Sequence, residues 1–367
     1  MRVIVVGGGA IGCAVALALA RRGVAVELLE RDLVGAGASG AAAGMLAPLS
    51  ESQAPGPFLP IGLAALREFA AWVDTVEALA GMRVDLVHSG VLMLAAPGEE
   101  AALRDRLDWQ RQHDPGATFL EGPALARLAP HLAAGPTAAL HYPNEVQVDA
   151  QRYTRALRRA AQAAGAHVQE GIQVTAILHR AGRATGVATT GERLDADAVV
   201  VASGSDGALL HPLGADLPLA PIKGEMVRLL PAGPLAGPIV FAPGGYLVPK
   251  ADGSLLVGAT QLPGRHDLGV AAGAVATLLA FAQRLVPELA VARFVDAWAG
   301  LRPGLPDRLP AIGPLPQLAA LWVAVGHHRN GILLAGWTGE RLAEAILDGA
   351  PLPEAVLPSR YLPAAAG

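Results

Sequence analysis

The chain has 367 residues, of which 52% are hydrophobic and 16% are charged, so it can bury a large core and is not intrinsically disordered. Its net charge of −4 provides no positive field for polyanionic nucleic acid or for an anionic membrane surface. Its single cysteine, Cys13, excludes an internal disulfide and a cysteine-rich metal cluster, and it favours a reducing cytoplasm.

The first elements of the chain are predicted to be a strand, a turn and a helix. Val3–Val6 is a β-branched run typical of a buried parallel strand, and Cys13–Arg22 is an alanine- and leucine-rich stretch that predicts a helix. The uncharged stretch 3–20 also resembles a signal peptide or a spanning helix. It contains four glycines, however, and each costs a helix roughly 1 kcal/mol relative to alanine. We therefore expect no membrane segment here.

The strand and the helix are joined by the motif Gly7-x-Gly9-x-x-Gly12. Gly7 permits a tight turn, Gly9 lets the backbone approach a pyrophosphate, and Gly12 lets helix and strand pack closely. The helix N-terminus adds unpaired N–H groups and about half a positive charge. A second strand, Val24–Leu29, leads to Glu30, whose carboxylate can accept both hydroxyls of an adenosine ribose. This order favours dinucleotide binding over a ligand-free glycine turn, and it does not choose between NAD and FAD.

The next segment, Gly35–Met45, consists almost entirely of glycine, alanine and serine. Small side chains allow a backbone to lie against a large flat ligand, whereas a low-complexity linker would interrupt the first domain. Further along the chain, helices are expected over 61–79, 99–113, 150–164, 270–285 and 337–348. Strands are expected over 84–95, 167–170, 173–179, 184–189, 197–202, 221–229, 239–260 with a hairpin turn at 251–253, and 321–325.

This order predicts an α/β protein with two domains. The first is a Rossmann-like dinucleotide-binding domain, which the family resemblance described below makes an FAD-binding domain, and the second is an inserted α+β substrate domain built on an antiparallel sheet. Both domains are expected to be discontinuous in sequence. The FAD-binding domain takes residues 1–85, 140–215 and 299–367, and the substrate domain takes 86–139 and 216–298.

With these residues in hand, the chain resembles the glycine oxidases, the thiamine-pathway branch of the D-amino-acid oxidase superfamily. The resemblance runs from end to end and rests on Gly7-x-Gly9-x-x-Gly12, Glu30, Ser39-Gly-Ala-Ala-Ala-Gly-Met45, Lys223-Gly-Glu225, Tyr246-Leu-Val-Pro-Lys-x-Asp-Gly, Val257-Gly-Ala-Thr260, Trp298-Ala-Gly-Leu-Arg-Pro303 and Gly326-His-His-Arg-Asn-Gly-Ile-Leu-Leu-Ala335. It implies noncovalently held FAD, oxidation of a small amino acid by oxygen to an imine or 2-oxo acid and hydrogen peroxide, a role in thiamine thiazole biosynthesis, and a homo-oligomer.

The resemblance also implies which residues bind cofactor and substrate. The residues near FAD are Gly7, Gly9, Ala10, Ile11 and Gly12 at the pyrophosphate, Glu30 and Arg31 at the ribose, Ala38, Ser39, Ala43, Gly44 and Met45 beside the flavin, Val174 at the adenine, and His327, His328, Arg329, Asn330, Gly331, Ile332 and Leu333 against the isoalloxazine. The substrate-binding residues are Arg302, Tyr246, Arg329 and Met45. No catalytic side chain is implied, because the flavin performs the chemistry.

A buried substrate carboxylate needs a planar partner that is always charged, which is arginine and not lysine. Spacing alone favours a surface ion pair for Arg302, whereas the resemblance favours the carboxylate. Tyr246 either packs across strands or donates one hydrogen bond to the same group. No general base is required, so we expect His327 and His328 only to shape the turn. Arg329 either binds substrate or has a structural role.

Other functions remain open at this point. A flavin dehydrogenase would pass electrons to a quinone or dye. A nicotinamide dehydrogenase would share only the first glycine motif. A flavin-binding scaffold would bind the cofactor but convert no substrate. The order of preference among glycine, N-alkyl glycines and small D-amino acids is also open. The chain departs from the family pattern at four positions near the expected site, which are Gly244, Gln261, Leu305 and His328.

Overall fold

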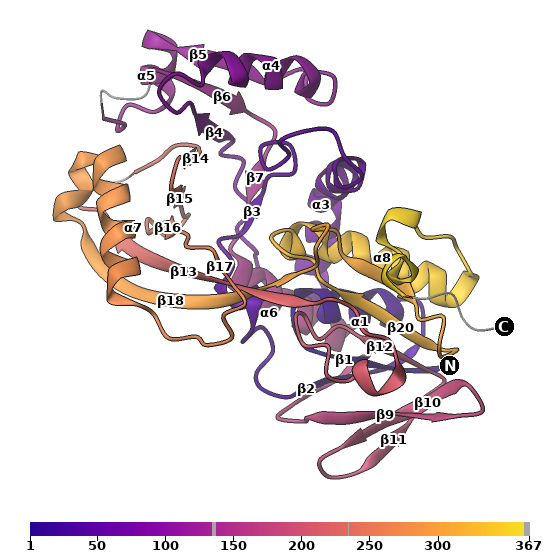
Figure 1. The fold of residues 1–367 in the computed structure, drawn as a ribbon. Coiled ribbons are helices and arrows are strands. Elements are labelled where there is room, and N and C mark those ends of the chain that lie inside the picture. The colour runs from indigo at the N-terminus through magenta and orange to yellow at the C-terminus, as the bar shows by residue number, and fades with distance from the viewer. Residues whose placement is uncertain (134–136, 234, 363–367) are drawn as a thin grey trace.

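Two large β-sheets organise the fold (Figure 1). The computed structural model describes residues 1–133, 137–233 and 235–362. One sheet has six strands in the order β19-β20-β12-β1-β2-β8, and the other has nine strands. The predicted α/β class is therefore confirmed, and the mainly antiparallel second sheet is present.

The six-stranded sheet is buried on both faces. Every neighbouring pair is parallel except β19 with β20. Val3, Ile4 and Val5 are fully buried, as the β-branched run predicts. The strands are β1 (Arg2–Val6), β2 (Ala25–Glu30), β8 (His167–Glu170), β12 (Ala198–Val201), β19 (Ala311–Pro314) and β20 (Leu321–Val325).

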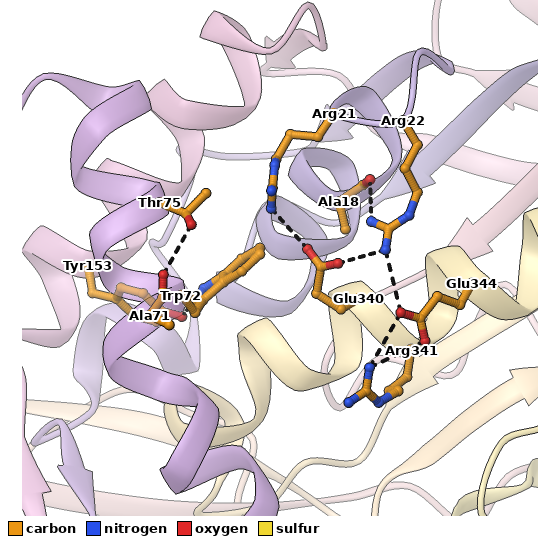
Figure 2. Close-up of polar contacts among 10 residues, drawn as sticks. All are labelled: Ala18, Arg21, Arg22, Ala71, Trp72, Thr75, Tyr153, Glu340, Arg341 and Glu344. Carbon is orange, nitrogen blue, oxygen red and sulfur yellow. Dashed lines mark hydrogen bonds and ion pairs between the residues drawn. The ribbon is translucent and has the colours of Figure 1, made fainter.

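One face of this sheet is covered by helices. Figure 2 shows how polar contacts join them: the Trp72 indole N–H donates to the Tyr153 hydroxyl at 2.8 Å, linking α3 to α6. Arg21 and Arg22, just after α1, pair with Glu340 of α8. The helices are α1 (Ala10–Ala20), α3 (Phe58–Ala80), α6 (Ala150–Ala163) and α8 (Gly331–Asp348). Within the described residues, no helix combines the length and the apolar character that crossing a bilayer requires.

The other face packs on a three-stranded antiparallel sheet, at the bottom of Figure 1. Ile4 and Val199 of the large sheet share a core with Ile177 and Val187 of the small one. Side chains of the six-stranded sheet therefore alternate between a helical layer and a β layer. The small sheet contains β9 (Val174–Arg180), β10 (Arg183–Thr189) and β11 (Arg193–Asp195).

The nine-stranded sheet is antiparallel except for the parallel pair β14–β4. Helix α7 (Ala272–Leu285) covers one face through Leu278 and Phe281. The strands are β4 (Val91–Leu94), β5 (Thr118–Glu121), β6 (Ala138–Tyr142), β13 (Ala220–Leu230), β14 (Ile239–Ala242), β15 (Gly245–Pro249), β16 (Leu255–Gly258), β17 (Leu262–Pro263) and β18 (Arg293–Gly304). The remaining elements are α2 (Ala38–Ala41), α4 (Glu100–Gln110), α5 (Gly122–Leu128), the strand pair β3 (Met45–Leu46) and β7 (Val146–Gln147), and the 3₁₀ turns His211–Leu213, Pro287–Val291, Glu354–Val356 and Pro358–Tyr361.

Helices α1 and α8, like α3, which begins at Phe58 and not at residue 61, begin earlier than the sequence predicts. Helix α1 begins at Ala10, not at Cys13, because the Cys13 N–H already donates to the Gly9 carbonyl at 3.0 Å. Helix α8 begins at Gly331, not at residue 337, because the Leu334 N–H donates to the Asn330 carbonyl. Both α1 and α8 include glycines in their first turns, although the low helix propensity of glycine favours a loop there. Tertiary packing therefore overrides helix propensity.

The predicted domain boundaries at 139/140 and 298/299 fall inside β6 and β18, which both belong to the nine-stranded sheet. The glycine- and proline-marked segment 298–303 is therefore strand, and it pairs along β13. The division into two domains itself stays a prediction.

Candidate active site

The glycine motif forms a tight cradle at the start of α1. A Cβ on Gly12 would lie 1.8 Å from the Gly7 carbonyl oxygen, and a Cβ on Gly7, whose φ is +109°, would lie 2.5 Å from the Ala202 carbonyl oxygen. Gly9 differs, because its Cβ would contact only the Ser39 Oγ, at 3.2 Å. Gly7 and Gly12 thus shape the turn, whereas Gly9 keeps space free in front of the helix.

The N-terminus of α1 is suited to an anion. All of α1 is buried, and its first turn has no acidic residue. One donor is satisfied within the protein, since the Ala10 N–H donates to the Ser39 Oγ at 2.9 Å. A buried helix start with a glycine at its N-cap and no acidic residue in its first turn fits a phosphate group. The residues present therefore fit the pyrophosphate of a dinucleotide.

Glu30 lies beside this cradle. Its carboxylate accepts from the Gly8 N–H at 2.6 Å and from the Asp32 N–H at 2.9 Å. The Ile172 N–H donates to the Glu30 carbonyl, which brings the connection that leads to Val174 alongside β2. Arg31, in contrast, is exposed and pairs with Asp206 at 2.8 Å. Glu30 thus lies at the cradle, and the segment that leads to Val174 runs beside it.

The small-residue segment approaches two other parts of the chain closely. Gly44 has a φ of +81°, and a Cβ there would lie 1.9 Å from the Val148 carbonyl oxygen. On the other side, a Cβ on Gly300 of β18 would lie 2.4 Å from the Ala41 Cβ. The backbone of this segment is thereby fixed between the residues just before α6 and the nine-stranded sheet.

Lys250, which the sequence analysis names only as part of a motif, holds the small-residue segment 35–45 in place. Its buried ammonium donates to the Ala43 carbonyl at 3.1 Å and to the Gln147 Oε1 and the Val148 carbonyl, both at 3.0 Å. Burial lowers the pKa of Lys250 to about 8. One side chain therefore ties the expected flavin side to β7 and the start of α6.

We expect Lys250→Met to destabilise the fold and to reduce the flavin content. Methionine fills a similar volume but leaves three buried acceptors unpaired, each costing about 1–3 kcal/mol. Thermal unfolding and the flavin-to-protein absorbance ratio are the measurements. Lys250→Arg, which keeps a cation, is the matched comparison. A Lys250→Met protein with unchanged stability and flavin content would show that the contacts of Lys250 with Ala43, Gln147 and Val148 are dispensable.

A cleft opens beside this segment, with about 630 Å³ of empty space that includes open solvent. Of the predicted residues, the structure brings Ala38, Ala43, Gly44, Met45, Tyr246, Arg302, His328, Arg329 and Ile332 into its lining. The cradle residues, Glu30, Arg31, Ser39, Val174, His327, Asn330, Gly331 and Leu333 lie outside it. The cleft is also lined by residues that the sequence analysis did not select, which are Ala41, Ala42, Glu51, Gly224, Met226, Gly300 and Leu301.

Arg302 reaches the cleft from β18. Its guanidinium lies over Gly224 of β13, where a Cβ would be 2.4 Å from the Arg302 Nη1. That nitrogen donates to the Thr260 carbonyl at 3.3 Å. Among the residues that the structure describes, no carboxylate forms an ion pair with Arg302. The described residues thus do not form the surface ion pair that spacing favours, and Arg302 lines the cleft without an acidic partner among them.

Arg329 behaves differently, because it is paired. Its Nε and Nη2 donate to the two carboxylate oxygens of Glu51 at 3.0 and 3.1 Å. Glu51 is the main cause of the raised pKa of Arg329. No motif contains Glu51, so the sequence gives no signal for this contact. The bidentate pair leaves Arg302 as the cation in the lining without an acidic partner.

Tyr246 is buried in the wall of the cleft. Its ring lies on Gly258, where a Cβ would be 2.4 Å from the ring, and its hydroxyl donates to the Met226 Sδ at 3.7 Å. Burial raises the pKa of Tyr246, and the nearby charges of Arg302 and Arg329 oppose that shift. The hydroxyl is therefore protonated and close to both guanidinium groups.

The two histidines belong to the turn before α8. His327 is buried against the Thr338 hydroxyl at 3.1 Å, and burial lowers its pKa to about 3. His328 has a φ of +48°, and its N–H donates to the Pro303 carbonyl at 2.8 Å. Burial, Arg329 and Arg302 lower the pKa of His328 to about 4. Both imidazoles are thus neutral near pH 7, and both residues hold the turn against its neighbours.

Comparisons with known proteins agree with this geometry. The family described as FAD dependent oxidoreductase matches residues 2–345. The chain is 39% identical over 349 residues to a glycine oxidase of Geobacillus kaustophilus, covering 94% of this chain and 92% of that one. It is 38% identical over 370 residues to a bifunctional protein ThiO/ThiG of Synechocystis, covering 98% of this chain and 54%, about half, of that longer one. The crystal structure of glycine oxidase from Geobacillus kaustophilus superposes with a TM-score of 0.89 at 36% identity, covering 96% of each chain.

Proposed function

Because the chain belongs to the family of FAD-dependent oxidoreductases, we propose that it oxidises glycine and related small amines that carry a carboxylate. The related substrates are sarcosine and other N-alkyl glycines, and small D-amino acids. The products are an imine or 2-oxo acid, ammonia or an amine, and hydrogen peroxide. The similarity to glycine oxidases supports this substrate class.

The observation that carries the proposal is the Arg302 guanidinium, which faces the cleft without a carboxylate partner in the described part of the chain. A planar guanidinium can donate two parallel hydrogen bonds to a substrate carboxylate. Tyr246 adds a hydroxyl donor on the same wall. A carboxylate held at two points fixes the orientation of the neighbouring α-carbon, which is the main task left to the protein.

The cofactor is FAD. We assign its pyrophosphate to the cradle formed by Gly7, Gly9 and the start of α1, and its ribose to Glu30. When bound, the flavin supplies the hydride acceptor. The segment 38–45 and the first turn of α8 would then flank the ring and exclude water from the α-carbon.

No side chain in the cleft is suited to take a proton near neutral pH. The pKa of His328 is lowered to about 4, so it is neutral and weakly basic, and burial raises the pKa of Tyr246. The carboxylate of Glu51 is engaged by Arg329. The substrate amine therefore loses its proton to solvent before or during binding.

We expect kcat/KM for glycine to rise toward alkaline pH with the ionisation of the substrate amine. The histidines titrate far below this range, because burial lowers their pKa values to about 3 and 4, so they contribute no limb to the profile. The measurement is kcat/KM against pH for the wild type and for His328→Asn, since asparagine tolerates a positive φ. A profile that is flat across the amine's titration, or a limb lost in the variant, would contradict this account.

The proposed reaction is tested by titrating the flavin spectrum without oxygen, using glycine, sarcosine, D-alanine and D-proline. Bleaching of the flavin by one or more of them is expected. An oxygen electrode and a peroxide assay then separate an oxidase from a dehydrogenase that uses a quinone or dye. Bound flavin that none of the four amines bleaches would favour a flavin-binding scaffold and overturn the proposal.

We further propose a role in thiamine thiazole biosynthesis and a homo-oligomeric state. The first is supported by the resemblance to thiamine-pathway glycine oxidases and by the match to a bifunctional ThiO/ThiG protein. The second follows from the resemblance alone, and light scattering of the FAD-loaded protein tests it.

A further inference from the structure

The charged residues in the described lining of the cleft are Glu51, Arg302 and Arg329. Glu51 compensates Arg329 through two hydrogen bonds, so the lining has a net charge of +1. A substrate with one carboxylate brings this balance to zero, whereas a substrate with two anionic groups leaves an uncompensated negative charge in a partly buried site. The cleft is therefore electrostatically matched to a single anionic group.

Buried side chains fix the turn that carries Glu51. The Gln110 amide donates to the Leu49 carbonyl at 2.8 Å, and the Glu145 Oε1 accepts from the N–H groups of Leu49 and Ser50 at 2.6 and 2.9 Å. Gln110 and Glu145 are almost completely buried. The backbone before Glu51 therefore cannot move freely, and its carboxylate is held in place before any ligand arrives.

The Arg329 donors that face Glu51 are occupied in this arrangement. The ion pair is partly buried, with 14% of the Glu51 side chain and 23% of the Arg329 side chain exposed. Arg329, Arg302 and Tyr246 line the same cleft. A ligand held by Arg302 thus lies within the influence of Arg329, and without Glu51 the second guanidinium could receive a second anionic group.

We propose that Glu51 is a specificity-determining residue that restricts this cleft to substrates with one anionic group. It does so by engaging the Nε and one Nη2 donor of Arg329, by compensating the charge of that guanidinium, and by repelling a second carboxylate or phosphonate. This inference rests on the proposed function, because it takes Arg302 as the site of the substrate carboxylate.

The test compares a monoanion with a dianion of the same kind. Acetate and malonate are titrated into the FAD-loaded full chain near neutral pH, and binding is followed by flavin absorbance and by calorimetry. In the wild type we expect acetate to bind at least as tightly as malonate. In Glu51→Gln the ratio of malonate affinity to acetate affinity should rise about tenfold or more, because a second full charge pair becomes available.

The double variant Glu51→Gln with Arg329→Gln should return the ratio to the wild-type value, since the second cation is removed as well. Glu51→Asp retains the charge and should retain the monoanion preference. Glu340→Gln, on α8 and outside the cleft, is the matched surface control. If Glu51→Gln fails to retain flavin, Glu51→Ala, which removes the same charge, provides the comparison with the wild type.

The outcomes separate this inference from the proposed function. Malonate binding more tightly than acetate in the wild type, or an unchanged ratio in a flavin-loaded Glu51→Gln protein, overturns the role of Glu51. In contrast, a wild type that binds no acetate and whose flavin is not bleached by any of the four amines overturns the proposed function itself.

Discussion

Replacing Arg302 by alanine is expected to weaken the binding of carboxylate substrates about a hundredfold or more. Removing one partner of a buried charge pair costs roughly 3–5 kcal/mol, because the other charge is left without compensation. Arg329 cannot substitute for Arg302 in the native arrangement, since both of its contacts to Glu51 are made. The loss should therefore be seen in KM for glycine and in the dissociation constant of acetate.

Two comparisons make this experiment specific. Arg302→Lys keeps the charge and loses the planar fork, so an intermediate loss is expected. Arg21→Ala removes an arginine that pairs with Glu340 away from the cleft and should leave substrate kinetics unchanged. Flavin content and thermal unfolding of each variant show whether the fold is kept. Normal kinetics in a flavin-loaded Arg302→Ala protein would exclude Arg302 as the carboxylate site.

Gly12→Ala should abolish FAD binding and strongly destabilise the first sheet. The new Cβ would lie 1.8 Å from the Gly7 carbonyl oxygen, and that atom belongs to the backbone and not to a flexible side chain. Overpacking of a tight core typically costs about 1–3 kcal/mol, and a backbone clash lies at the upper end. The measurements are the absorbance of the visible flavin bands after reconstitution and the midpoint of thermal unfolding.

Two other glycines serve as matched controls. Gly273→Ala in α7 would place its Cβ in open space and should keep both stability and flavin. Gly9→Ala would contact only the Ser39 Oγ, at 3.2 Å, so the fold should survive while the space for the pyrophosphate is reduced. A full complement of flavin in Gly12→Ala would show that the cradle does not require a glycine there. Full flavin in Gly9→Ala would contradict the placement of the pyrophosphate.

The strands and the central helices are largely predictable from sequence because their signals are local. Strand β20 at Leu321–Val325 has the predicted bounds, and α6 ends one residue before the predicted end. The start of α8 is not predictable in this way, since glycine and asparagine at its first turn favour a loop. Burial of Ile332, Leu333 and Leu334 in the core beside the six-stranded sheet outweighs that preference.

By itself, the sequence determined the turn at the start of α1, because Gly12 is required by the Gly7 carbonyl only five positions away, and Gly7 is required by its own φ of +109°. Only the tertiary structure decided the charge of the cleft. Glu51 and Arg329 are 278 positions apart, and Lys250 and Ala43 are 207 apart, so no local pattern records either contact. Pairing between such groups depends on how the two large sheets and their connections pack, and the free energy of that packing is distributed over the whole core.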